Sequence, residues 1–157
     1  MTGVFLMVVL ALLGAYMLSV TGMQQSGSQL DVQGARAYQA ARAGMEWGAW
    51  QVLDPNNAIG TPALPVCPPS PTNLTGFAGS LSPFTVTVTC NAAINAPTTE
   101  GNRNVGAYQI IATACNQPAA GACPNLAPAT GYVERQIQAT LSKCKDPTAA
   151  GPRFSCG

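Results

Sequence analysis

The residues of this sequence with the most obvious chemistry are its six cysteines, all of which follow residue 60: Cys67, Cys90, Cys115, Cys123, Cys144 and Cys156. An even number of cysteines confined to the polar part of a chain is typical of an oxidised, exported domain. A zinc site is the competing use, but no pair has C-x2-C spacing and the sequence contains no histidine. Spacing alone does not fix the connectivity, because six cysteines permit many pairings. Proximity along the chain favours Cys67 with Cys90, Cys115 with Cys123, and Cys144 with Cys156.

The other ionisable side chains form no recognisable catalytic or metal-binding group. Without histidine, Ser-His-Asp and Cys-His catalysis and His-ligated metals are excluded. The acids are scattered along the chain: Asp31, Glu46, Asp54, Glu100, Glu134 and Asp146. No Gly-rich phosphate loop or nucleophile elbow is present. We therefore expect no enzymatic activity, no cofactor and no metal. The tripeptide Asn73-Leu74-Thr75 matches a glycan acceptor, but such tripeptides arise often by chance.

Length and charge narrow the function further. A chain of 157 residues has room for one ordinary domain and one additional element. Charged residues make up 8% of it, compared with about 25% in a typical soluble domain. Seven Lys and Arg against six Asp and Glu give a net charge of +1, which provides no basic patch for phosphates. Nucleic acid is therefore not expected as the main partner.

The first 30 residues contain no Lys, Arg, Asp, Glu or His, and residues 3–20 are almost wholly apolar. Eighteen residues in a helix reach about 27 Å, close to the roughly 30 Å hydrocarbon core of a bilayer. The sequence thus predicts a segment that can span a membrane. No basic residue precedes it, as a signal peptide or an oriented membrane helix would require. We infer that a basic leader has been removed upstream of Met1; the alternative is a plain single-span anchor that lacks its leader.

The apolar run continues into a stretch rich in helix formers, and no proline occurs between it and Pro55. One helix is therefore predicted from about residue 2 to about residue 53. Its second half has an apolar stripe at steps of three or four, which we expect to pack on the protein's own sheet: Ala35, Tyr38, Ala41, Met45, Ala49 and Val52. Trp47 and Trp50 are expected to be core or interface anchors. The domains are then 1–30, the apolar half-helix; 31–53, the amphipathic half; and 54–157, a disulfide-rich β domain.

Glycines are unusually frequent in this helix, at positions 14, 22, 27, 34, 44 and 48. Each costs about 1 kcal/mol relative to alanine, so their number indicates close helix approach or a place where the helix can unwind. Ser19 to Gly22 is the weakest stretch. We expect the isolated chain to be helical throughout, with a break between Gly14 and Gly22 in an assembled state.

Three strands are predicted after a connection rich in Pro, Gly, Asn and Ser. Residues 84–90 alternate apolar side chains with Thr85, Thr87 and Thr89, which indicates a half-buried strand with a polar outer face. Residues 105–115 are the second candidate. Residues 132–144 are the third, although they also fit a short helix. The expected fold is α+β, with a long helical spine packed on a small antiparallel sheet that is stapled by disulfides.

This architecture resembles that of the type IV pilins and pseudopilins. The stretches QGARAYQAARAGMEWGAWQVL, FTVTVTC and GYVERQIQATLSKC are similar, more narrowly, to the minor pilins of mannose-sensitive haemagglutinin pilus biogenesis. The resemblance implies a structural subunit of a pilus-like filament, with a leader cut by a prepilin peptidase. It also implies that Cys144 and Cys156 close a C-terminal loop. The implied partners are other pilin subunits, the pilus assembly machinery and the bacterial inner membrane before assembly; the implied destination is an extracellular filament.

The resemblance assigns the N-terminal helix to assembly, through Met1, Phe5, Val8, Leu12, Gly14 and Gly22. One departure concerns its fifth position, where major pilins usually carry a glutamate and this chain has Phe5. In the family, that glutamate is thought to neutralise the N-terminal amine of a neighbouring subunit. Its absence favours a minor or specialised subunit. The alternative function is a minor or tip pilin that acts as a membrane-anchored adhesive module.

Overall fold

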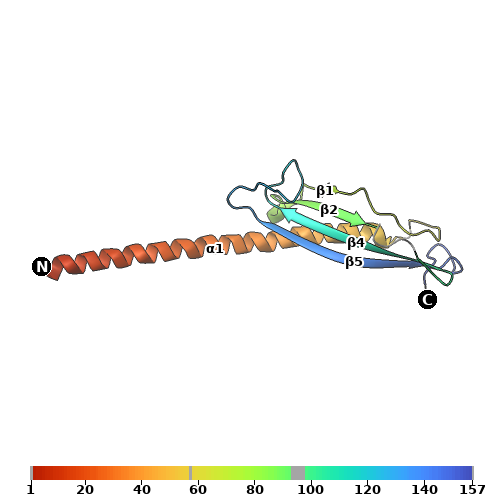
Figure 1. The fold of residues 1–157 in the computed structure, drawn as a ribbon, viewed down its shortest axis with the longest axis horizontal. Helices are drawn as coiled ribbons and strands as arrows, with labels where there is room; N and C mark the ends of the chain where they lie inside the picture. Colours follow the sequence, from red (N-terminus) through yellow and green to blue (C-terminus); the bar gives the residue numbers. More distant parts are fainter. Residues whose placement is uncertain (1, 57, 93–97, 157) are drawn as a thin grey trace.

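The computed structural model describes residues 2–56, 58–92 and 98–156. Its main feature is one unbroken helix, α1 (Thr2–Leu53), whose second half lies against a β-sheet while its first half projects away from it (Figure 1). The predicted α+β class and the predicted helix are confirmed. Local propensity explains the helix bounds, because good helix formers fill it and Pro55 follows its end.

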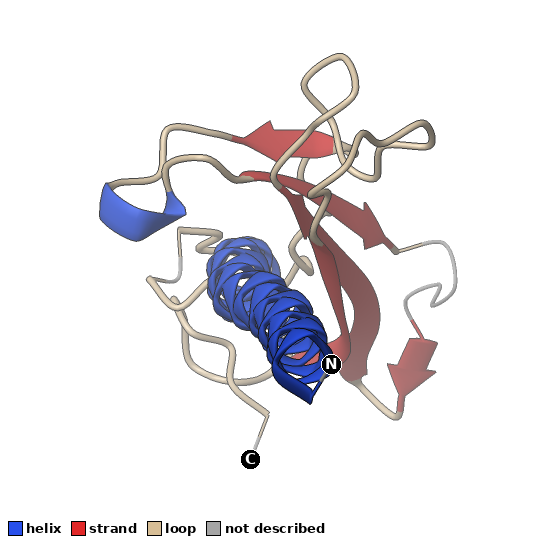
Figure 2. Cartoon of the chain, turned by 90° about the vertical axis from the view of Figure 1, so that its left-hand side faces the viewer, coloured by secondary structure: helices blue, strands red, loops and turns tan. Residues whose placement is uncertain are grey.

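The sheet has five strands, all antiparallel: β1 (Thr72–Leu74), β2 (Thr85–Asn91), β3 (Thr98–Glu100), β4 (Arg103–Cys115) and β5 (Glu134–Lys145). β4 is central. β5 pairs along one of its edges over nearly the whole strand, and β2 and β3 pair with successive parts of the other edge. β1 lies outside β2. Seen along the helix, the sheet curves around one side of α1 (Figure 2).

The three predicted strands are confirmed within two residues at each end, and the third is a strand rather than a helix. The connection before them was predicted without regular elements, and this was wrong. It contains β1 and a short 3-10 helix, η1 (Gly79–Leu81). β3 was also missed. Strands of three residues are too short for an alternating pattern, and they form here because longer strands offer them a paired edge.

The stripe by which α1 contacts the sheet differs from the predicted one. Ala41 and Val52 are buried as expected, and Met45 and Ala49 pack at the margin of the core, but Ala35 and Tyr38 are exposed. The buried positions are instead mostly glycine and alanine: Gly34, Ala37, Ala40, Ala41, Gly44, Gly48 and Val52. The reason is close approach. A Cβ atom on Gly48 would lie 2.9 Å from Ile110 Cγ2, so only glycine lets the helix backbone come this near the sheet.

The core lies between this stripe and the inner face of the sheet, where Val86, Val88 and Ile110 are buried. Trp47 is partly buried and packs against this core, as expected. Trp50 is 52% exposed and is not part of this core, so of its two predicted roles only that of an interface anchor is left.

The outer face of β2 is not the solvent-facing surface that the threonine alternation predicted. Thr85 and Thr87 are both buried, because the loop that follows β4 folds over them. The amide of Cys123 in this loop donates to Thr87 Oγ1 at 2.8 Å, and Thr87 in turn donates to the Asn73 side chain on β1 at 2.8 Å. The hydroxyls are thus the internal hydrogen-bond partners of a covering loop.

The six cysteines form three disulfides, with the pairing that proximity favoured: Cys67–Cys90, Cys115–Cys123 and Cys144–Cys156. The first ties the segment after the helix to the end of β2. The second closes the loop that covers β2, and the third ties the C-terminal segment to β5. All three therefore constrain loops around one small sheet, where the core alone supplies little stability.

Candidate functional site

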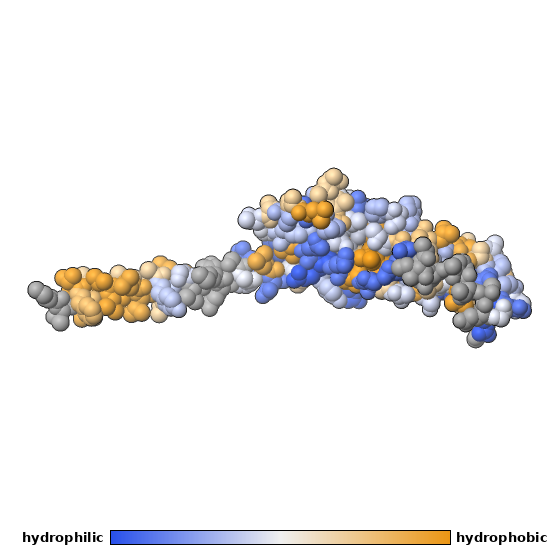
Figure 3. Space-filling model, viewed as in Figure 1, coloured by the Kyte–Doolittle hydropathy of each residue, from blue (hydrophilic) through white to orange (hydrophobic). Residues whose placement is uncertain are grey.

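Most of the large apolar side chains that the structure describes as exposed lie on the first third of α1, where they form an apolar surface (Figure 3). Its large apolar side chains are between 36% and 77% exposed: Val4, Phe5, Leu6, Met7, Val8, Val9, Leu10, Leu12, Leu13, Tyr16, Met17 and Leu18. Soluble monomers rarely expose a contiguous apolar surface of this extent. Where such a surface is exposed, it usually marks a site of interaction with a protein, a membrane or a ligand.

This surface has no polar side. With 3.6 residues in each turn, the run from Val4 to Leu10 passes nearly twice around the helix, and every one of these residues is apolar. A helix that is apolar all round requires an apolar environment all round. Pairing with a single partner helix covers only a stripe and leaves the opposite side in water.

The residues assigned to assembly take the following places. Phe5, Val8 and Leu12 are 71%, 52% and 66% exposed on this surface, and a Cβ atom on Gly14 would have open space around it. Gly22 lies within the continuous helix, as expected for the isolated chain. Met1 lies outside the described residues. The part of the helix thought able to unwind already has one local side-chain bond, from Ser19 Oγ to the Tyr16 carbonyl at 2.8 Å.

The predicted membrane span is not confirmed. Among the residues that the structure describes, no helix combines the length and the apolarity that crossing a membrane would need.

The carboxylates whose side chains are described are engaged in local structure, with the exception of Asp31. Asp54 directly follows the helix with a left-handed φ of 46°, and its carboxylate accepts hydrogen bonds from the amides of Ala58 at 2.8 Å and Ile59 at 3.2 Å. Glu46 pairs with Arg42 at 3.1 Å. Hydrogen bonds from Thr148 hold the pKa of Asp146 below its usual value. Within the described parts of the chain, no cluster of His, Cys, Asp or Glu could hold a metal ion.

Tyr132 and Glu134 form another such local pair. The Tyr132 hydroxyl donates to the Glu134 carboxylate and accepts from the amide of Asn125 at 3.0 Å. Partial burial, with the hydrogen bond to Glu134, raises the pKa of Tyr132 above its usual value. The pair fixes the loop that follows β4 to the start of β5.

Two lysines with structural roles were missed from the sequence. Lys145 is fully buried, and its ammonium donates to the carbonyls of Ile59 at 2.6 Å and Thr61 at 2.9 Å. Lys143 donates to the carbonyl of Leu53 at 2.5 Å, at the end of α1, where a cation complements the helix dipole. The sequence carries a signal for this, because both lysines continue the alternation of Ile137, Ala139 and Leu141 along β5.

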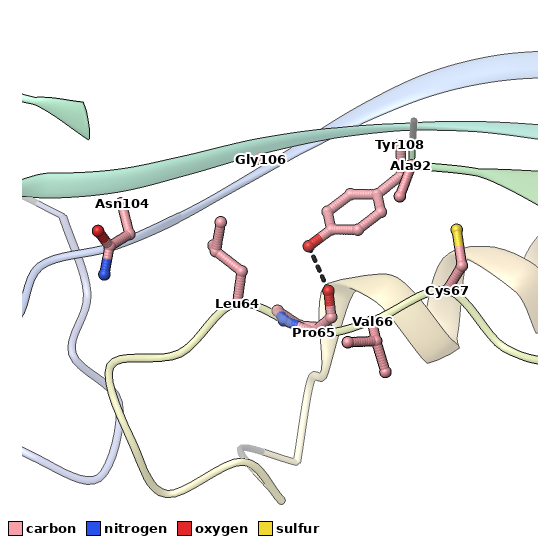
Figure 4. A pocket seen from close by; sticks show the side chains of 8 residues that line it. All are labelled: Leu64, Pro65, Val66, Cys67, Ala92, Asn104, Gly106 and Tyr108. Carbon is pink, nitrogen blue, oxygen red and sulfur yellow. Dashed lines mark hydrogen bonds between the residues drawn. The ribbon is translucent and has the colours of Figure 1, made fainter. Parts of the chain in front are cut away.

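A second feature is a hollow of about 420 Å³ beyond the end of the helix, between β4 and residues 64–67 (Figure 4). Its lining is mostly apolar. The Tyr108 hydroxyl donates to the Pro65 carbonyl at 2.5 Å, and Asn104 Nδ2 donates to the Pro62 carbonyl at 3.1 Å. Burial raises the pKa of Tyr108. The hollow could hold a small apolar group, but its two polar side chains are already used in holding the loop.

Comparison with known proteins finds no matching family model, curated protein or solved structure. The protein thus consists of an exposed apolar half-helix and a globular domain with three disulfides.

Proposed function

We propose that this protein is a structural subunit of a type IV pilus-like filament, assembled through the first half of α1. The observation that carries the proposal is that the side chains from Val4 to Leu18 are exposed on every side of the helix. A filament core surrounds each helix with the helices of several neighbours, which is the environment that such a surface requires. Before assembly, the bacterial inner membrane offers the same side chains an apolar environment; afterwards the subunit lies in an extracellular filament.

The driving force would be hydrophobic burial and not chemistry, so the protein would not be an enzyme. If neighbours bury about 1,000 Å² of apolar surface on each helix, the gross gain is on the order of 25 kcal/mol before entropic costs. That gain is enough for a durable polymer. Assembly by this route would need neither a cofactor nor a metal.

If Met1 is the first residue of the mature chain, the side chain of Phe5 favours a minor or specialised subunit over a major one. It is 71% exposed and apolar, so it cannot neutralise the N-terminal amine of a neighbouring subunit. An unpaired buried charge is expensive, so entry into the filament would depend on apolar packing or on a carboxylate from another subunit.

Electron microscopy of material sheared from cells, with mass analysis of its N-terminal residue, tests the proposal. Val8→Asp or Leu12→Lys should abolish assembly, because each places an unpaired charge in a dry core at a cost of several kcal/mol. Leu126→Asp is the matched control, since Leu126 is 92% exposed on the globular domain. It should leave filaments unchanged. Normal filaments from Val8→Asp would refute the proposal.

The second candidate function is a minor or tip pilin that binds a surface or glycan as a membrane-anchored module. The hollow beside Tyr108 favours it, because its mostly apolar lining could hold a small apolar group of a ligand. The two candidate functions predict different forms of the protein on cells. A sheared, soluble polymer made of this chain supports the structural subunit, whereas a permanently membrane-bound monomer supports the binding module.

A further inference from the structure

Two charges on α1 have no partner within the described chain. The helix carries four charged residues: Asp31, Arg36, Arg42 and Glu46. Arg42 and Glu46 pair with each other at 3.1 Å, one helical turn apart. Asp31 and Arg36 are both exposed, and neither makes a hydrogen bond or ion pair with any described residue. They cannot pair along the helix as Arg42 and Glu46 do, because side chains five residues apart do not face each other.

These two charges lie on opposite flanks of the helix. Five residues correspond to a rotation of about 140° around the axis and a rise of about 7.5 Å. The stripe that begins at Gly34 and Ala37 packs on the sheet, and Asp31 and Arg36 lie on either side of it. One flank is therefore negative and the other positive.

We propose that Asp31 of one subunit pairs with Arg36 of the next, and that this contact sets the stagger between neighbouring helices. The inference rests on the proposed filament. In a filament this contact is heterologous, so that one flank of each subunit meets the opposite flank of the next. When Asp31 of one subunit pairs with Arg36 of the next, the first subunit keeps a free Arg36 and the second a free Asp31. Each of these can pair with a further subunit, so the contact repeats along the polymer. Such a heterologous contact generates an open helical polymer and not a closed pair.

The surface beside Arg36 has space for a neighbouring side chain. Arg36 lines two hollows along this part of the helix, of about 490 Å³ and about 400 Å³. The second of them lies between α1 and η1, at Leu81. A carboxylate on an adjacent helix can thus approach the guanidinium without displacing the domain.

An anionic lipid headgroup is the competing partner for Arg36. We favour a second copy because the same short stretch of helix also presents Asp31. A lipid phosphate would attract Arg36 but repel the nearby carboxylate, whereas another copy of this chain satisfies both charges.

Charge reversal in the full chain tests this contact. The chain is purified in detergent, the detergent is removed, and the polymer is measured by sedimentation. Asp31→Arg and Arg36→Asp should each raise the concentration needed for polymerisation about tenfold, because each replaces an attraction with a repulsion. The double variant should restore that concentration to within about twofold, since the pair is re-formed with its signs exchanged. Arg153→Asp, at an exposed position of the C-terminal segment, makes the same change in net charge as Arg36→Asp and should have no effect.

The outcomes are distinguishable. If the wild-type chain forms no polymer by itself, a filament built of this chain alone is refuted, and this inference with it; the proposed function is tested separately by the filaments sheared from cells. If the wild-type chain polymerises and the single reversals do not matter, or the double variant is not restored, only the pairing is overturned. An equal loss in Arg153→Asp would also overturn it, because net charge would then be the cause. The lipid alternative predicts that Arg36→Asp weakens binding to phosphatidylglycerol vesicles and that the double variant does not recover polymerisation.

Discussion

Replacing Gly44 with alanine should destabilise the protein, although alanine is the better helix former. Gly44 lies where α1 crosses the sheet. A Cβ atom placed on it would be 2.5 Å from Val86 Cγ1, 3.2 Å from Val88 Cγ2 and 3.4 Å from Ala112 Cβ. The first distance is far inside van der Waals contact. One added methyl group must therefore push the helix and the sheet apart or force a valine from its rotamer.

Two opposing effects set the magnitude. Alanine gains about 1 kcal/mol over glycine in a helix interior. Adding a methyl group to a well-packed core costs about 1 to 3 kcal/mol. Val86 and Val88 are almost completely buried, so their methyl groups have little room to move, and the larger costs in this range apply. We expect a net loss of about 1 to 2 kcal/mol in the free energy of unfolding.

Urea unfolding of the full chain in mild detergent, followed by tryptophan fluorescence, measures this loss. Gly34→Ala is the matched control, on the same helix and the same buried stripe. Its Cβ atom would lie 2.9 Å from Arg135 Nη2, the end of a flexible side chain that can move aside. Gly34→Ala should therefore be neutral or stabilising. If Gly44→Ala proves as stable as Gly34→Ala, the close approach of helix and sheet is not a constraint and the reasoning is wrong.

Three other predictions concern the disulfides, the buried lysine and the assembled helix. Alkylation of the denatured, unreduced protein should add no mass, and uptake at Cys144 or Cys156 would contradict the C-terminal bridge. Lys145→Met should lower the free energy of unfolding by about 1 to 3 kcal/mol, because two carbonyls lose their donor, and by more than Lys143→Met at its more exposed site. In filaments we expect a non-helical break within residues 14–22, each unwound residue adding about 1.8 Å. A filament map with unbroken helix there would count against the last prediction.

The sequence predicted the elements whose signals are local. The helix follows from propensity and the absence of proline over its length, and the three long strands follow from runs of β-branched and alternating residues. Proximity along the chain correctly predicted the three disulfides, since each joins two cysteines that are consecutive in the order of cysteines in the sequence. The exposed apolar surface of α1 can also be predicted directly, because Phe5, Val8 and Leu12 form part of one apolar run in the sequence.

The features that were missed depend on contacts between distant residues. Counting only apolar side chains placed the helix stripe on Ala35 and Tyr38, because glycine carries no hydropathy signal although it permits the closest packing. The covering of Thr87 could not be foreseen, since its partner is an amide 36 residues further along the chain. The sequence analysis made no prediction for Lys145, whose burial depends on carbonyls 84 and 86 residues away.

Both halves of α1 present an apolar contact surface, but the two surfaces differ in the size of their side chains. Where the helix meets its own sheet, the contact residues are glycine and alanine at Gly34, Ala37 and Gly44, so the backbone lies close to large side chains supplied by the strands. From Val4 to Leu18 the helix itself supplies the large side chains, and they project in all directions. Such a half-helix fits best among surfaces that can interdigitate with large side chains, such as further copies of itself. The change from small to large residues therefore separates the part of the helix that completes the domain from the part that is available to other molecules.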